Sequence, residues 1–186
     1  ITPIVVDLRE LLDRHIDRQI LVRGRIHKVT LKKTFAFIIL RYQTSSLQIV
    51  VSRNVLGQEN FHKLTSLNHE SVIDCIGTLR ESPVKIESTS YHDFEMDLIS
   101  FEVIGRALPI PFQIEDANDF GNSFRSDVHN HTRLDNRWVD LRAPVNNAIF
   151  KTQSAISQLF RRFLLTYDFI EIHSPKLIGS ASECGA

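Results

Sequence analysis

The basic residues of this chain are concentrated in one segment, Arg18 to Gln58, which contains eight lysines or arginines and no aspartate or glutamate. The rest of the chain carries 14 basic and 22 acidic residues, so the formal net charge is zero. Nucleic-acid phosphates favour such a concentration, because each neutralised phosphate releases condensed counterions. The segment indicates nucleic-acid binding; the alternative is an ordinary solvated strand face.

Two aromatic residues in the same segment, Phe35 and Phe37, could stack on unpaired bases, because every base has a flat face. The amide of Gln48, further along the segment, can both donate a hydrogen bond to a base edge and accept one. Phe35 and Phe37 are two residues apart, so in a strand they point to the same side. That side is either the core or the ligand face, and the sequence leaves both alternatives open.

Strand patterns predict how these residues are positioned. Runs of alternating or β-forming residues predict five strands, which cover 20–27, 35–40, 47–51, 71–79 and 94–104. A short helix is predicted near 60–67, between the third strand and the fourth. This order matches the OB-fold, a partly open Greek-key barrel whose second and third strands bind oligonucleotides. We therefore predict a mainly β N-terminal domain that binds RNA.

A linker is expected after the barrel. Arg106-Ala-Leu-Pro-Ile-Pro is a stiff exit, and residues 115–130 are polar, with Gly, Asn, Ser and Asp. His129 and His131 could suggest a metal, but two histidines without a third ligand make a poor site. We predict a hinge over 107–131 and no metal.

The C-terminal part begins with an amphipathic helix. From Asn146 to Tyr167, apolar residues recur with the spacing of one helical face. Residues 169–173 then alternate as in a strand before Pro175, which lacks an amide donor and so ends a strand or lies on its edge. A long helix and a short strand ending at proline resemble motif 1 of the class II aminoacyl-tRNA synthetases. In that family motif 1 forms the homodimer interface, which implies that Pro175 lies at an interface.

Two more segments resemble the same family. Thr132-Arg-Leu-Asp-Asn-Arg-Trp-Val-Asp-Leu-Arg142 is similar to the segment leading into the catalytic domain of the aspartate, asparagine and lysine enzymes, and closest to the aspartate branch. Gly179-Ser-Ala-Ser-Glu-Cys-Gly-Ala186 is similar to a mobile Ser-Glu-Gly-Gly loop of the eukaryotic cytosolic and archaeal aspartate enzymes. The resemblance runs from about Gln19 to Ala186. It implies an OB-fold anticodon-binding domain over 1–106 and, over 132–186, the start of a class II α+β catalytic domain.

The resemblance also implies roles for barrel residues. Phe37 matches a phenylalanine that stacks on an anticodon base, and Gln48, Ser88 and Glu95 match further anticodon contacts. For Ser88 and Glu95 the alternatives are a turn serine and a solvated strand glutamate. Four basic residues are predicted to contact tRNA phosphates, which position the RNA without specifying its sequence: Arg25, Lys28, Lys32 and Lys33. The connection over 29–34 is shorter than in the family, so we assign none of the family's base contacts to it.

In the last segment, Glu183 matches the family's loop glutamate that contacts the bound amino acid, and Ser182 lies beside it. A carboxylate near the α-ammonium of L-aspartate offers a charge-assisted hydrogen bond. Cys184 stands where the family has glycine, and its side chain restricts positive φ angles and hence loop closure. We assign these residues to substrate binding and assign no catalytic residue.

The family's reaction is the activation of L-aspartate by ATP, with Mg²⁺, and its transfer to tRNA for protein biosynthesis. Motifs 2 and 3, whose arginines bind ATP, do not occur in these 186 residues. Because adenylyl chemistry depends on such charge-neutralising groups, we expect a fragment that is inactive alone and binds neither ATP nor Mg²⁺. The alternatives are a non-catalytic OB-fold RNA-binding module and a sister ligase, asparaginyl or lysyl.

Composition limits the cellular setting. Cys75 and Cys184 lie far apart and suggest neither a disulfide nor a metal site, which fits a reducing compartment. No apolar run approaches the ~20 residues that span a bilayer, and the first residues do not resemble a signal peptide. We expect a cytoplasmic protein whose partners are the aspartate tRNA, L-aspartate and a second copy of itself, without DNA or membrane.

Overall fold

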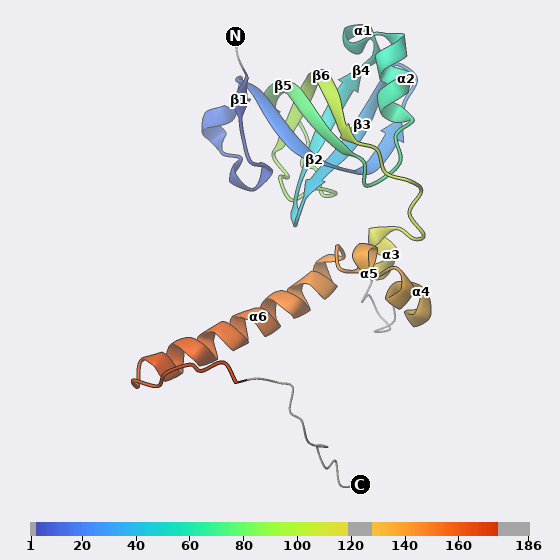
Figure 1. The fold of residues 1–186 in the computed structure, drawn as a ribbon. Coiled ribbons are helices and arrows are strands. Elements are labelled where there is room, and N and C mark those ends of the chain that lie inside the picture. Colours follow the sequence, from blue (N-terminus) through green and yellow to red (C-terminus); the bar gives the residue numbers. More distant parts are fainter. Residues whose placement is uncertain (1–2, 119–127, 175–186) are drawn as a thin grey trace. The chain divides into compact units, whose positions relative to one another are not determined.

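The computed structural model describes residues 3–118 and 128–174 (Figure 1). The chain divides into two compact units, Ile1–Pro144 and Val145–Ala186, and each is considered by itself. None of the helices in the described ranges is long and apolar enough to cross a membrane.

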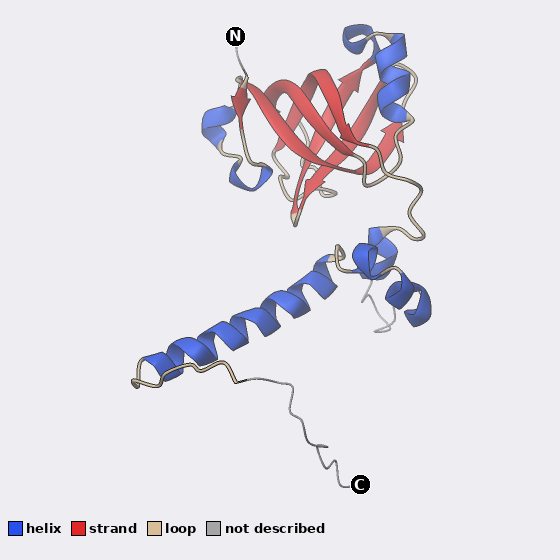
Figure 2. Cartoon of the chain, viewed as in Figure 1, coloured by secondary structure: helices blue, strands red, loops and turns tan. Residues whose placement is uncertain are grey.

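The first unit is built on a closed barrel of mixed strands (Figure 2). Its strands are β2 (Gln19–Leu31), β3 (Phe35–Tyr42), β4 (Ser45–Ser52), β5 (Val72–Glu81) and β6 (Phe94–Gly105). They follow the order β2-β3-β4-β6-β5, and β5 pairs with β2 to close the ring. Within the ring only β4 and β6 run parallel. The predicted OB-fold is confirmed.

One further strand was not predicted. β1 (Ile4–Val5) pairs in parallel with β2, and two short 3₁₀ helices follow it, η1 (Leu8–Glu10) and η2 (Asp13–His15). A strand of two residues is too short to show an alternating pattern.

Alternate residues of each strand fill the barrel. On β3 and β4 the inward side chains are at most 1% exposed: Ala36, Ile38, Leu40, Leu47, Ile49 and Val51. Phe35 and Phe37 occupy the intervening positions of β3, and because strand side chains alternate, both face outward. The structure thus places the two phenylalanines on the outer face of the barrel.

Two short helices lie between β4 and β5, where the sequence predicted only one, near residues 60–67. They are α1 (Arg53–Leu56) and α2 (Gln58–Thr65), joined at Gly57, whose φ of 79° favours glycine. Phe61 and Leu64 of α2 are buried in the barrel core. This apolar face explains why the helix forms there.

After the barrel, the described part of the first unit has three short helices: α3 (Ile114–Asn118), α4 (Asn130–Asp135) and α5 (Arg137–Asp140). A second small core forms around α3 and α5 and contains Phe112, Ile114, Ala117, Val139 and Ala143. Part of the predicted hinge and part of the segment starting at Thr132 therefore pack together. The three domain limits remain predictions.

The second unit consists mainly of α6 (Pro144–Leu165), close to the predicted helix. Pro144 is the first helical residue, where its fixed φ and missing N–H are tolerated. The residues Phe169–Ser174 have no strand partner, and Ile170 and Ile172 are 86% and 78% exposed. The prediction of a strand over 169–173 is wrong for the described chain, because a strand needs a neighbour to bond with.

Candidate nucleic-acid interface

The outer face of β3 and β4 brings Phe37 and Gln48 together. Phe37 pairs with Val50 and Gln48 pairs with Ile39, two positions further along the strands, so their side chains lie on one face. Both side chains are half-buried. Phe35 supports Phe37 in an edge-to-face contact, with ring centroids 5.2 Å apart. The ring of Phe37 can stack on one base. The amide of Gln48 can form hydrogen bonds with the edge of the same base or of a neighbouring one.

Gln48 belongs to a polar network that crosses three strands. Its Nε2 donates a hydrogen bond of 2.9 Å to Oε2 of Glu95 on the neighbouring β6. Nη2 of Arg80, on β5, lies 2.8 Å from the other carboxylate oxygen, and Nε of Arg80 lies 2.7 Å from Asp97 Oδ2. The predicted contact Glu95 is therefore an ion-paired side chain that is only 6% exposed, which differs from a solvated strand glutamate.

The strand pairing that builds this network depends on Gly77. A Cβ at this position would lie 2.3 Å from the backbone oxygen of Asp97, so only glycine allows β5 and β6 to approach this closely. The pairing register shifts between Ile76 and Gly77 and then continues to place Arg80 opposite Glu95. Gly77 thus allows the strand pairing that places Arg80 beside Glu95.

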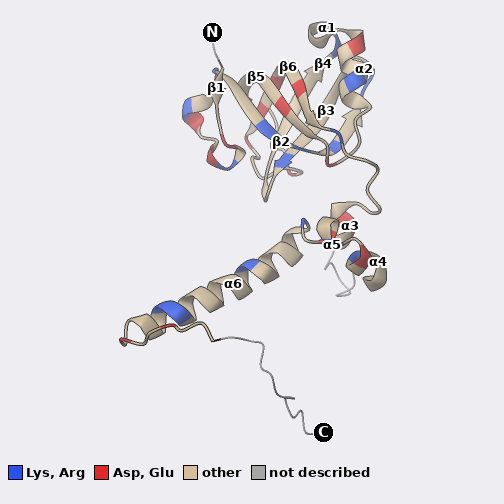
Figure 3. Ribbon diagram, in the orientation of Figure 1, with Lys and Arg blue, Asp and Glu red and all other residues tan. Residues whose placement is uncertain are grey.

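Three of the four predicted phosphate contacts lie near the aromatic pair. Lys28 is exposed opposite Ile39, and Lys32 and Lys33 are exposed in the turn between β2 and β3, before Phe35. Figure 3 shows basic positions of the ribbon in blue, among them positions on β2. Cations at these places could bind phosphates on either side of a stacked base.

The fourth predicted contact, Arg25, lies elsewhere on the barrel. It pairs with Arg41, four residues along β3 from Phe37, which corresponds to ~13 Å. Its Nη1 donates to the backbone oxygen of Glu70 at 3.2 Å. The structure therefore does not bring Arg25 together with the aromatic pair.

Ser88 is exposed in a turn of the connection between β5 and β6. This connection is fastened to β4, because the backbone N–H of Ser46 donates to Ser90 Oγ at 2.7 Å and the N–H of Ser90 donates to Ser46 Oγ at 2.9 Å. Ser46 is two residues from Gln48 on the same strand. Ser88 is thus carried by a loop anchored beside the candidate site.

Glu70 forms a second cluster, which the sequence did not reveal. Its carboxylate is 2% exposed and lies 2.5 Å from Nη2 of Arg41 and 2.7 Å from Nη1 of Arg142. Arg25 Nε is 3.9 Å away, and the pKa of Arg25 is lowered first by burial and then by the nearby charge of Arg142. No local pattern marks such a residue, because its partners come from distant parts of the chain.

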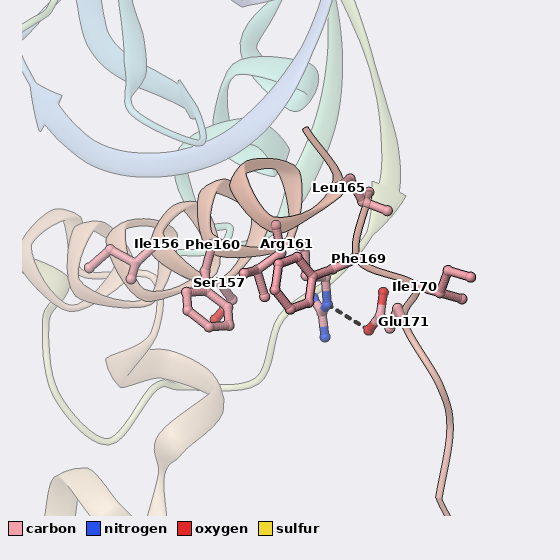
Figure 4. A pocket seen from close by; sticks show the side chains of 9 residues that line it. Ile156, Ser157, Phe160, Arg161, Leu165, Phe169, Ile170 and Glu171 are labelled. Carbon is pink, nitrogen blue, oxygen red and sulfur yellow. Dashed lines mark hydrogen bonds and ion pairs between the residues drawn. The ribbon is translucent and has the colours of Figure 1, made fainter. Parts of the chain in front are cut away.

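The second unit has an apolar pocket of about 540 Å³ (Figure 4). It is lined by Ile156, Ser157, Phe160, Arg161, Leu164, Leu165, Phe169, Ile170 and Glu171. At its edge, Arg161 Nε lies 2.9 Å from Glu171 Oε1. The pocket contains no arrangement of groups that would perform chemistry.

The remaining predicted site residues, Pro175, Ser182 and Glu183, lie outside the described residues, as does Cys184. Their roles remain predictions.

Comparisons with known proteins agree with this architecture. Residues 20–104 match the family model "OB-fold nucleic acid binding domain", and residues 129–186 match "tRNA synthetases class II (D, K and N)". A barrel of the first kind followed by a segment of the second defines the class as class II aminoacyl-tRNA synthetases.

Individual relatives narrow this class. The chain is 35% identical over 189 aligned residues to the cytoplasmic aspartate–tRNA ligase of Homo sapiens, covering 98% of this chain and 38% of the relative. A crystal structure of a putative aspartyl-tRNA synthetase from Leishmania major matches 97% of this chain and 36% of its own with a TM-score of 0.90 at 31% identity. The aspartyl-tRNA synthetase of Entamoeba histolytica matches 95% of this chain and 40% of its own with a TM-score of 0.87 at 31% identity. The chain belongs to the aspartyl-tRNA synthetase family and spans well under half the length of these relatives.

Proposed function

We propose that the whole protein is an aspartate–tRNA ligase, which uses ATP and Mg²⁺ to activate L-aspartate and transfers it to its tRNA in the cytoplasm. The similarity to cytoplasmic aspartate–tRNA ligases over 98% of this chain supports the proposal. Within it, Glu183 and Ser182 contact L-aspartate. Neither ATP nor Mg²⁺ is expected to bind these 186 residues alone, because motifs 2 and 3 are not among them.

The barrel is proposed to bind the anticodon loop of the aspartate tRNA. The observation that carries this proposal is the outward position of Phe37 beside Gln48, with the exposed Lys28 on the neighbouring strand. Stacking on Phe37 supplies affinity and the polar side chains supply specificity. The alternative, a strand face that only contacts solvent, does not explain why two phenylalanines pack edge to face on it.

Replacing Phe37 with alanine tests this proposal. Phe37→Ala should weaken binding of an aspartate anticodon stem-loop by ~1 to 3 kcal/mol, the usual loss for one stacked base. Fluorescence anisotropy of a labelled stem-loop measures the affinity. Tyr42→Ala is the matched control, because Tyr42 is an exposed aromatic residue at the other end of the same strand. Unchanged affinity in a folded Phe37→Ala chain would contradict the assignment.

The second unit is proposed to form an isologous dimer interface in the whole protein. The apolar residues of α6 are exposed in the single chain: Ile156, Leu159, Phe160 and Phe163 are each at least 58% exposed. A contiguous apolar face of this kind marks a protein interface, and a two-fold dimer buries the same patch of both copies. Pro175 is assigned to this interface.

Sedimentation measures this association. A longer form of the protein should sediment as a dimer at micromolar concentration, and Phe160→Glu should shift it toward monomer, because a carboxylate in an apolar interface has no compensating partner. Gln153→Glu, at an exposed polar position of α6, adds the same single negative charge and is the control. A longer form that sediments only as a monomer would rule out the interface.

A further inference from the structure

We propose that Arg80 is a positioning residue for base recognition: through Glu95 it fixes the orientation of the Gln48 amide, so that Gln48 presents a hydrogen-bond acceptor to the RNA. The inference rests on the proposed binding of an anticodon loop to this face. Arg80 was not among the residues predicted from the sequence to take part in binding.

Glu95 has one contact on each carboxylate oxygen. Oε1 faces Nη2 of Arg80 at 2.8 Å, and Oε2 accepts the hydrogen bond from Nε2 of Gln48 at 2.9 Å. A carboxylate can only accept, so the amide group that faces it must be the NH₂. The amide carbonyl Oε1 of Gln48 is then turned away from Glu95 and is the group offered to a ligand.

Arg80 stabilises the charge on which this orientation depends. Glu95 and Asp97 are two residues apart on β6, so their side chains lie on the same face, and Arg80 forms ion pairs with both. Among the ion pairs of the described residues, Arg80 is the only cation that contacts Glu95. Without it, a carboxylate that is 6% exposed would face the like charge of Asp97 without compensation.

The orientation has a consequence for specificity. A glutamine free to rotate its amide can serve a base that donates or a base that accepts. A glutamine held by Glu95 discriminates, because a base without an N–H at that place leaves the Gln48 carbonyl unpaired in the complex. We therefore expect Gln48 to select a base with an N–H donor on its pairing edge.

The test uses stem-loops with the aspartate anticodon GUC in which one base at a time loses pairing-edge donors. The probes carry N1-methylinosine in place of guanosine, N3-methyluridine or N4,N4-dimethylcytidine. The wild-type 186-residue chain should lose about tenfold or more in affinity for one of the three, the loss expected of one unmet hydrogen bond. Gln48→Leu should reduce that loss to about threefold or less, which identifies the base that Gln48 contacts.

Two variants then address the positioning role. Arg80→Met keeps the aliphatic stem of Arg80 and removes the cation, and Glu95→Gln allows the Gln48 amide to face either way. Both should reduce the tenfold loss at the identified base to about threefold or less. Binding of the unmodified loop should stay measurable through stacking on Phe37 but be weaker than in the wild-type chain, because the Gln48 amide is no longer held in one orientation. Arg23→Met is the matched control, because Arg23 forms a similar cross-strand pair with Asp74 away from Gln48, and it should keep the full loss.

The outcomes separate the two proposals. If the wild-type chain binds none of the stem-loops, the proposed anticodon binding fails and the inference fails with it. If the wild-type chain binds the stem-loops, a folded Arg80→Met chain could still keep the tenfold loss of affinity for the modified base, or no longer bind any loop. Either result overturns only the role of Arg80. If Arg80→Met does not fold, Glu95→Gln decides by the same criterion.

A measurement without RNA tests the same geometry. In the free chain, the side-chain amide protons of Gln48, assigned by their absence in Gln48→Leu, should include one shifted by its hydrogen bond to Glu95. That signal should move in Arg80→Met and stay in Arg23→Met. A signal unaffected by Arg80→Met would contradict the inference.

Discussion

The 186-residue chain alone is expected to give no aspartate-dependent exchange of pyrophosphate into ATP, whereas a longer form containing motifs 2 and 3 is expected to be active. The exchange reaction needs groups that neutralise the triphosphate and position its α-phosphate. The chain contains Glu183, which can orient the amino acid but has no favourable contact with a phosphate. Exchange of labelled pyrophosphate measures the activity of both proteins, and activity of the 186-residue chain would contradict the need for motifs 2 and 3. An inactive longer form would instead favour the non-catalytic RNA-binding module.

The longer form also tests the role of Glu183. Glu183→Ala should raise the KM for aspartate by about 10- to 100-fold, the range expected for one charge-assisted hydrogen bond, and should affect the KM for ATP far less. Glu59→Ala, which changes an exposed glutamate on α2, serves as the control. Normal aspartate kinetics in Glu183→Ala would remove Glu183 from the amino-acid site.

Glu70→Gln is expected to destabilise the first unit by about 3 to 5 kcal/mol, the cost of leaving buried charge uncompensated. The substitution keeps the shape of the side chain and the backbone contacts of Glu70, but removes the charge that faces Arg41 and Arg142. Because Arg41 is itself only 7% exposed, water cannot readily replace the lost carboxylate beside it. Urea unfolding followed by the fluorescence of Trp138, the only tryptophan of the chain, measures the change.

The control for Glu70→Gln is Asp74→Asn, which removes a carboxylate from a pair whose arginine, Arg23, is 58% exposed. Because solvent screens this pair, Asp74→Asn should cost much less stability. If the two variants lose the same free energy of unfolding, the buried ion pairs of Glu70 with Arg41 and Arg142 contribute no more to stability than an exposed pair.

Local sequence patterns were sufficient to predict the five strands of the barrel and the helix α2. Strands whose inward positions are filled by Ile, Leu and Val alternate clearly, and α2 shows its apolar face through Phe61 and Leu64. The face occupied by Phe37 could not be predicted, because alternation states only which residues share a side. The structure shows that Ala36 and Ile38 are buried on the core side of β3. Phe37 therefore faces outward.

Residues whose environment depends on distant partners escaped prediction. Glu95 is buried because Arg80 and Gln48, on two other strands, lie beside it, and Glu70 is buried because Arg41 and Arg142 converge on it. Conversely, the alternating residues 169–173 predicted a strand that the described chain lacks. In each case the structure depends on contacts between residues far apart in the sequence. A local sequence pattern cannot predict such contacts.

The most direct test of the central claim is the affinity of the 186-residue chain for stem-loops that differ only in the anticodon. We predict that the aspartate loop, with GUC, binds about fivefold or more tightly than loops carrying the asparagine anticodon GUU or the lysine anticodon UUU, because a wrong base leaves polar groups of the site unpaired. The same anisotropy titration measures all three. Equal affinity for the three loops, or tightest binding of the asparagine or lysine loop, would contradict the assignment of this barrel as a reader of the aspartate anticodon.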